Sequence, residues 1–183
     1  MGNFYTNINI KTSYSDDIKT EVERHFLSGY IIISPGWITI CSESMEQNDL
    51  AASKAMCEIT ANVKALGISF LNHDDDVLTM SVSNMGKTVF TYNSDPGYFN
   101  GEDQGPIING IENLISLGLV NNLFVLSAAL KSKDETFAHQ KHQRICKILQ
   151  VTEASISASS EYLDGGDYPT GVNESDVIEL HDN

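Results

Sequence analysis

The chain contains few cysteines, and their positions exclude the common cysteine-based frameworks. Cys41, Cys57 and Cys146 are widely spaced, their number is odd, and no CxxC pair occurs among the 183 residues. A zinc ribbon needs paired cysteines, and a disulfide framework needs an even set. We therefore expect three reduced cysteines in the core of a cytoplasmic protein.

Long apolar runs are also missing. No stretch approaches the roughly 20 apolar residues that span a bilayer, although 41% of the residues are hydrophobic, which is enough to build a core. The segment Met1–Tyr5 has neither the basic residues nor the apolar run of a secretory signal. We therefore expect a protein that is neither secreted nor embedded in a membrane.

Basic residues are scarce. The 11 Lys and Arg residues are outnumbered by 25 Asp and Glu, the net charge is −14, and no Lys or Arg follows Lys147. Because nucleic acids and anionic membrane surfaces attract the opposite charge, we expect neither as a partner. An acidic surface steers toward basic protein partners, although solubility alone explains the same charge.

The motifs of common enzyme and nucleotide sites are absent. The sequence has no GxSxG elbow, no HExxH zinc motif, no GxGxxG loop and no phosphate-binding P-loop. Gly97, Gly101 and Gly105 recur at four-residue spacing, but they lie in an acidic segment that repels phosphate. We therefore predict no cofactor, no catalytic residue and no enzymatic activity.

The sequence does contain the periodicity of a mixed α and β fold. Residues 4–10 alternate as a half-buried strand, and helical patterns follow Ser15 and either Asn48 or Asp49. Further strand patterns occur at 30–33, 37–41, 68–71, 77–82 and 87–92. The first four strands and two helices have the order β-α-β-β-α-β of a ferredoxin-like α+β sheet. The last two strands form a hairpin that extends this sheet or starts a second one.

The composition changes after residue 93, and the chain divides into four parts. We predict an α+β sheet domain at 1–93, a loop rich in Gly, Pro, Asn and Asp at 94–106, a helical region at 107–172 that packs on the sheet as one compact unit, and an acidic tail at 173–183. The helical patterns run over 107–117, 121–131 and 134–149. We expect the tail to fray, although Val177, Ile178 and Leu180 could dock.

The most unusual stretch is His73–Asp76, where three consecutive aspartates follow a histidine between two strand patterns. Three interpretations stay open: a tight turn capped by the aspartates, an acidic patch that faces a basic partner, and a metal or acid–base site. Neighbouring residues of a strand point to opposite faces, so the aspartates converge on one ion only if the backbone turns sharply. His139 and His142 share a helical face and could supply further ligands, although a polar helix face is the simpler explanation for them.

Acidic and aromatic residues near turns and loop ends are the candidate partner-binding residues. Tyrosine and tryptophan are favoured anchors of protein interfaces, although the same side chains can close the ends of a core. The predicted set comprises Asp74, Asp75, Asp76, Asp95, Tyr98, Glu102, Asp103, Asp164, Asp167 and Tyr168.

Three segments of the chain carry a resemblance. They are NFYTN at Asn3–Asn7, LNHDDDVL at Leu71–Leu78 and YNSDPGYF at Tyr92–Phe99. They resemble a group of small uncharacterised bacterial cytoplasmic proteins over about the first hundred residues, with His142 and Tyr162–Gly171 as looser matches. In general character the chain also resembles the immunity proteins that are encoded beside bacterial antagonism toxins, which are often small, acidic and without catalytic motifs.

Three functional hypotheses follow. The first is an immunity protein that neutralises a cognate toxin by occluding its active site, with the acidic loops against a basic toxin surface. The second is a metal-dependent hydrolase in which His73, Asp74, Asp76 and either His139 or His142 hold a metal that activates water. The third is a non-enzymatic housekeeping interaction module.

Overall fold

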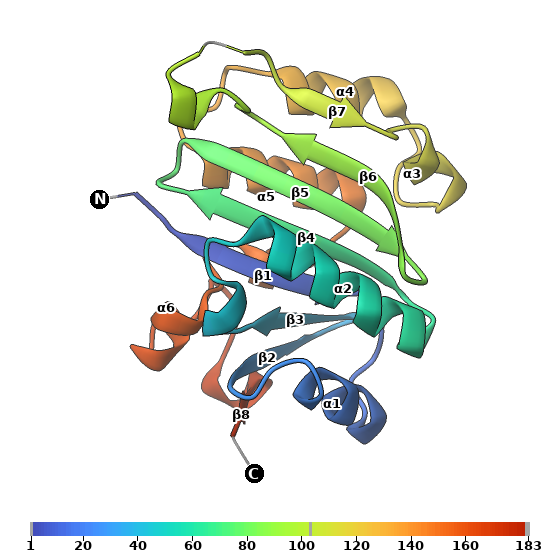
Figure 1. Cartoon of the computed structure of the whole chain (residues 1–183), viewed down its shortest axis with the longest axis vertical. Coiled ribbons are helices and arrows are strands. Elements are labelled where there is room, and N and C mark those ends of the chain that lie inside the picture. The colour runs from blue at the N-terminus through green and yellow to red at the C-terminus, as the bar shows by residue number, and fades with distance from the viewer. Residues whose placement is uncertain (1, 103, 182–183) are drawn as a thin grey trace.

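The computed structural model describes residues 2–102 and 104–181 (Figure 1). Its strands are β1 (Tyr5–Ile10), β2 (Gly29–Ser34), β3 (Trp37–Cys41), β4 (Leu66–His73), β5 (Val77–Asn84), β6 (Lys87–Asn93), β7 (Ile107–Asn109) and β8 (Val177–Leu180). Its helices are α1 (Asp16–Glu23), α2 (Asp49–Val63), α3 (Asn113–Ser116), α4 (Leu123–Lys131), α5 (Ala138–Leu149) and α6 (Ser160–Asp164). Within the described ranges, none of these helices combines the length and the apolar character that crossing a membrane requires.

The strands of the described residues form one antiparallel sheet of eight, in the order β7-β6-β5-β4-β1-β3-β2-β8. The strand β1 lies inside the sheet, where Ile8 is opposite Ser69 of β4 on one side and Ile40 of β3 on the other. Hairpins connect β4, β5 and β6 in succession. The strand β8, from the end of the chain, pairs with β2 and covers the edge that β2 would otherwise expose.

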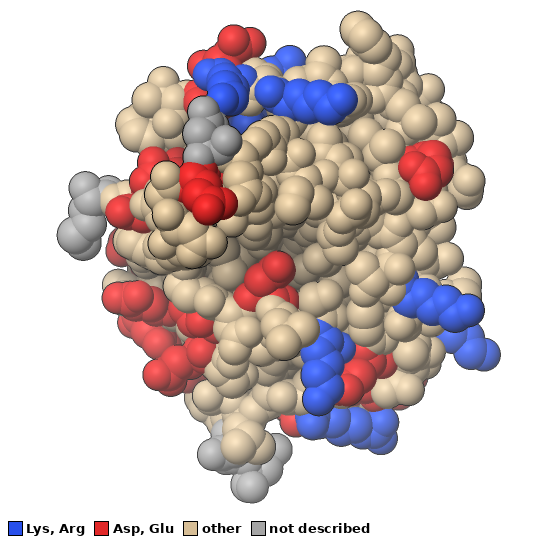
Figure 2. Space-filling model, turned by 45° about the horizontal axis from the view of Figure 1, so that its top comes forward, with Lys and Arg blue, Asp and Glu red and all other residues tan. Residues whose placement is uncertain are grey.

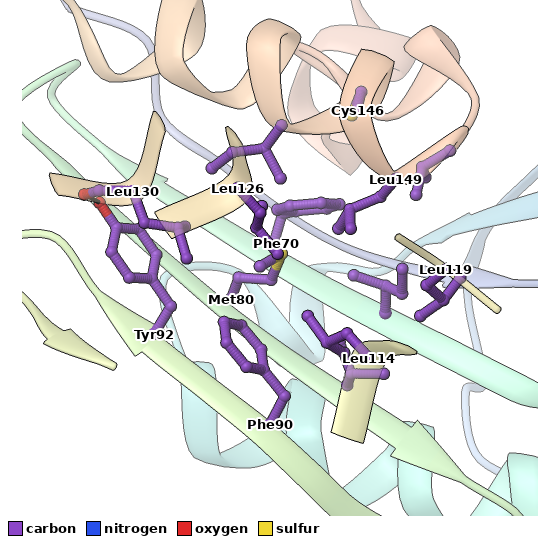
Figure 3. Packing of buried hydrophobic residues seen from close by; sticks show 14 of the residues in the cluster. Phe70, Met80, Phe90, Tyr92, Leu114, Leu119, Leu126, Leu130, Cys146 and Leu149 are labelled. Atoms are coloured by element: carbon purple, nitrogen blue, oxygen red, sulfur yellow. Dashed lines mark hydrogen bonds between the residues drawn. The ribbon is translucent and has the colours of Figure 1, made fainter. Parts of the chain in front are cut away.

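Helices cover both faces of the sheet (Figure 1). The helices α1 and α2 lie on one face, over the side chains of Ile8 and Ile10. On the opposite face, α3, α4 and α5 cover β4, β5 and β6, and the segment around α6 covers β2 and β3. Figure 3 shows the core of this second face, where Phe70, Met80, Phe90 and Tyr92 of the sheet meet Leu114, Leu119, Leu126, Leu130, Cys146 and Leu149.

The predicted α+β class is confirmed, but the sheet has eight strands where the sequence predicts six. The strand β7 occupies the start of the helix predicted at 107–117, because Gly110 takes a left-handed φ of 73° that no helix continues through. The strand β8 occupies part of the predicted acidic tail, and Leu180 becomes almost completely buried against the sheet. Both added strands are short and lie at the sheet edges.

The strand β1 is buried on both faces, whereas its alternating pattern predicts one exposed face. Asn7 and Asn9, on the face expected to be exposed, have no accessible surface. The Asn7 amide donates hydrogen bonds to the backbone oxygens of Ser155 and Ala158 at 2.8 and 3.0 Å. A buried amide is tolerated when its hydrogen bonds are made. The segment that follows α5 therefore covers β1 through polar contacts.

Candidate functional site

The residues His73–Asp76 form a tight turn between β4 and β5. Asp74 and Asp75 have φ angles of 53° and 58°, and the Asp76 N–H donates to the carbonyl oxygen of His73 at 3.0 Å. Two successive positive φ angles are typical of a type I′ hairpin turn, and aspartate tolerates this region better than most residues. The sharp turn points the three carboxylates in different directions.

Asp75 points inward and connects three segments. Its carboxylate accepts hydrogen bonds from the Asn3 backbone N–H at 3.2 Å, from the Asn3 side chain at 2.8 Å and from the Asn72 side chain at 2.9 Å. The Nδ1 atom of His139 lies 2.8 Å from the same carboxylate, and the Ala138 N–H donates to the Asp75 carbonyl at 2.6 Å. Only 7% of Asp75 is exposed, so this residue does not take the partner-facing position expected from the sequence.

The hydrogen bonds of Asp75 keep its carboxyl group ionised. Burial raises the pKa of Asp75, but the hydrogen bonds from Asn72, His139 and Asn3 outweigh burial and hold the pKa below its ordinary value. An ionised acceptor makes stronger hydrogen bonds than a neutral one. Asp75 therefore fixes the N-terminal segment and the start of α5 against the turn.

Asp74 and Asp76 are exposed on the outer side of the turn. The Gly2 N–H donates to the Asp74 carboxylate at 3.1 Å, and a Cβ atom at Gly2 would collide with the Asp74 backbone. The Tyr98 hydroxyl donates to the Asp76 carboxylate at 3.0 Å, which raises the pKa of Tyr98. The two carboxylates hold neighbouring segments in place and remain accessible to a partner.

Aromatic rings surround His73 on this outer side. The ring centroids of Phe4, Phe99 and Tyr98 lie 5.1, 5.0 and 5.9 Å from that of His73. The Nδ1 atom of His73 is also 2.7 Å from the side-chain oxygen of Gln47. Phe99 is 75% exposed. Exposed aromatic rings are enriched at protein-binding surfaces.

Of the predicted residues of the C-terminal region, Asp167 and Tyr168 lie beside the same N-terminal segment, whereas Asp164 contacts β2. Asp167 and Tyr168 line a pocket of about 340 Å³ that Gly2 also lines. Asp164 accepts a hydrogen bond from the Tyr30 hydroxyl, which raises the pKa of Tyr30. Gly2 also donates a hydrogen bond to Asp74. The acidic residues of the β4–β5 turn and those that follow α6 are therefore neighbours at one end of the sheet.

Asp95 lies at the border of the acidic surface to which Asp74, Asp76 and Asp167 belong. Its carboxylate accepts a hydrogen bond from the Gly97 N–H at 3.2 Å, which closes its own loop. Asp95 and Asp76 line a hollow of about 190 Å³ together with Lys133 and Lys141. The acidic surface is therefore bounded by lysines where α4 connects to α5.

We call this surface the acidic end. It comprises Asp74, Asp76, Asp95, Tyr98, Phe99, Glu102, Asp164, Asp167 and Tyr168. Figure 1 places the β4–β5 turn and α6 at the left of the sheet, and Figure 2, turned about the horizontal axis, shows acidic side chains crowded on that side. Asp103, which also belongs to the predicted set, lies outside the described residues.

The residues of the hypothetical metal site do not converge. His73, Asp74 and Asp76 contact different partners on the outer side of the turn, as described above. His139 pairs with the inward-facing aspartate, and His142 is buried against β1. Within the ranges that the structure describes, no group of three or more His, Cys, Asp or Glu side chains could hold a metal ion.

A buried polar network lies behind the turn, and it was not predicted from the sequence. The Nδ1 atom of His142 is 2.8 Å from the Tyr5 hydroxyl, and its Nε2 atom is 3.1 Å from the Ser155 hydroxyl. Burial lowers the pKa of His142 to about 3, so the ring is neutral and can donate with one nitrogen and accept with the other. All three side chains lack solvent exposure, which fits a structural role. Polar residues at alternate positions of β1 were the signal that could have indicated it.

The acidic end therefore combines exposed carboxylates, an exposed aromatic side chain and a backbone that is fixed by buried hydrogen bonds. No protein-family model, curated protein or solved structure matches the chain, so likeness to a known protein assigns neither a ligand nor an activity to this surface.

Proposed function

We propose that the chain is an immunity protein that binds a basic protein toxin through the acidic end and occludes the active site of that toxin. One observation carries the proposal. The acidic residues of the β4–β5 turn and those in and after α6 are distant in the sequence but lie together at one end of the sheet, around exposed aromatic side chains. Dispersed carboxylates would serve solubility equally well, whereas carboxylates gathered at one end create a local negative field that attracts a basic partner.

In this proposal, charge speeds the association of the two proteins, and aromatic contacts slow their dissociation. The net charge of −14 and the exposed carboxylates attract a basic partner from a distance and speed its association. After contact, Phe99 and Tyr168 supply the apolar area that slows dissociation, because buried aromatic anchors dominate interface energetics. The carboxylates around them fix the orientation of the partner.

The backbone of the acidic end supports tight binding because it is held in place before the partner arrives. Asp75 joins the turn to Asn3 and to the start of α5 through the buried hydrogen bonds described above. A surface that does not have to order itself on binding loses less entropy in the complex.

We also propose a finer classification of the fold and a location. The strand order β4-β1-β3-β2, with α1 and α2 on one face, supports assignment of the first half of the chain to the ferredoxin-like plan. A cytoplasmic location is consistent with three free cysteines, of which Cys41 and Cys146 are buried.

The experiment that tests the proposal uses the protein encoded by the neighbouring gene. We expect the two proteins to co-purify when they are expressed together, and the chain to relieve the toxicity of its neighbour at equal amounts. A neighbour that remains fully toxic in the presence of excess chain would overturn the proposal. Co-purification with a harmless neighbour would instead support the housekeeping interaction module.

The metal-dependent hydrolase receives no comparable support. Its candidate ligands are engaged with separate partners, and His139 is held by Asp75. Thermal unfolding with and without added Zn²⁺, Mn²⁺ or Mg²⁺ separates the two hypotheses. We expect no stabilisation by any of these ions, whereas a saturable increase in the unfolding temperature would favour the hydrolase.

A further inference from the structure

A second surface, distinct from the acidic end, is nearly free of charge. Glu112 is the only charged residue between Gln104 and Leu130, in a chain where charged residues make up 20%. This segment contains β7, α3 and most of α4. Figure 2 shows a broad area away from the crowded acids that carries few charged side chains. None of the described acidic-end residues belongs to this segment.

The same segment exposes large apolar side chains. Phe124 of α4 is 82% exposed, Val125 beside it is 45% exposed, and Ile115 of α3 is 47% exposed. An exposed phenylalanine in a segment with little charge has the composition of the centre of a protein interface. Since the acidic end draws a basic partner elsewhere, the proposed toxin has no electrostatic reason to bind here.

We propose that this surface binds a second copy of the chain, with α4 of one protomer packed antiparallel against α4 of the other. The net charge of −14 makes two copies repel each other. Contact between copies is therefore favoured where the surface carries no acid, and α4 supplies the largest exposed side chain there. An isologous contact places identical surfaces together, which is the commonest symmetry of protein dimers.

The exposed face of α4 is self-complementary in this arrangement. Phe124, Ala128 and Lys131 are exposed and follow one another at spacings of four and three, so they share one face of the helix. In an antiparallel pair that crosses near Ala128, the two small side chains allow close approach of the backbones. Phe124 of each protomer then lies opposite Lys131 of the other, where a lysine ammonium over an aromatic ring is attractive.

Sedimentation analysis of the full chain over a wide concentration range tests the proposal. We expect a monomer–dimer equilibrium in which Phe124→Glu weakens association by about 1,000-fold or more, the effect of losing one interface hot spot on each protomer. Lys131→Ala removes both symmetric pairs and should weaken association by about 5- to 30-fold, the range for two exposed cation–π pairs. Added salt should strengthen the dimer, because it screens the repulsion between two acidic copies.

Phe99→Glu is the matched control, because Phe99 is 75% exposed but belongs to the acidic end. It should leave the dimer unchanged. A chain that stays monomeric throughout, a dimer that Phe124→Glu does not weaken, or a dimer that Phe99→Glu disrupts equally would each overturn the proposal. Circular dichroism and the unfolding temperature are used to check that each of the three variants folds. The experiment needs no toxin, so its failure leaves the proposed immunity function untouched.

Discussion

At the scale of single residues, three consecutive aspartates have three different environments. Asp75 is buried and hydrogen-bonded, Asp74 holds the N-terminal segment, and Asp76 accepts from Tyr98. Because the backbone at Asp74 and Asp75 is left-handed, the side chains of the three aspartates point in different directions. The sequence shows only three identical side chains, so it cannot indicate which one turns inward. That choice depends on Asn3, which is distant in the sequence.

Asp75→Asn tests the structural role of the inward aspartate. The amide would place a donor against groups that already donate and would remove the negative charge. We expect a loss of about 2 to 3 kcal/mol in the free energy of unfolding, the range for hydrogen bonds to a charged group. Urea unfolding measures this loss of free energy, and Asp74→Asn is the control at an exposed position. Equal stability of the two variants would contradict this role.

His142 gives the second prediction at this scale, through pH. The pKa of His142 is about 3 in the folded chain against 6.5 for a free histidine, so below pH 6.5 only the unfolded chain takes up the proton. The stability that His142 contributes is therefore fully present above pH 6.5 and is lost as the pH falls toward 3. Between pH 7 and pH 5 the expected loss is about 2 kcal/mol.

The measurement compares the wild-type chain with His142→Gln, which keeps one donor and one acceptor. Glu46 acts in the opposite direction in this range, because burial raises its pKa to about 7, but it is present in both proteins. The difference between their unfolding free energies should shrink steadily from pH 7 to pH 5. A difference that is independent of pH would show that His142 is not buried in its neutral form.

At the scale of elements, periodicity indicates the long elements and misses the short ones. The alternation of residues 4–10 and the helical pattern after Asn48 correspond to β1 and α2. The strands β7 and β8 contain three and four residues, too few for alternation to differ from chance. These two segments become strands because they pair with β6 and β2, and this pairing depends on the tertiary structure. The buried polar face of β1 has the same cause, because a distant segment covers it.

Leu180→Ala tests the contribution of β8 to the sheet. Leu180 is 2% exposed and packs with Ile31 of β2 in the core beneath α1. We expect a loss of about 2 to 4 kcal/mol in unfolding free energy, typical of a buried leucine. Native-state hydrogen exchange should quicken first in β2, whose edge β8 covers. Glu179→Ala, at an exposed position of the same strand, is the control; equal exchange rates in the two variants would contradict this role for β8.

At the scale of the whole molecule, two surfaces differ in their charge. The acidic end carries carboxylates around Phe99, and the Gln104–Leu130 segment carries exposed apolar side chains almost without charge. The sequence predicted most members of the acidic end as separate acidic loops. Their proximity could not be predicted, because it depends on the N-terminal segment lying between the β4–β5 turn and the loop after α6.

The central claim is that the acidic end binds a basic protein, and the most direct measurement is the affinity of the chain for the product of its neighbouring gene. The variant Asp74→Lys with Asp76→Lys changes the acidic end and spares Asp75. The control, Glu58→Lys with Glu112→Lys, makes the same change in net charge at exposed positions on α2 and beside α3.

Calorimetric titration at low and high salt should show binding that weakens with salt, and a loss of affinity of about tenfold or more for the acidic-end variant. The control variant should bind within a few-fold of the wild-type chain. Equal losses in the two variants would show that only net charge matters, and an affinity unchanged by the acidic-end substitutions would contradict the claim.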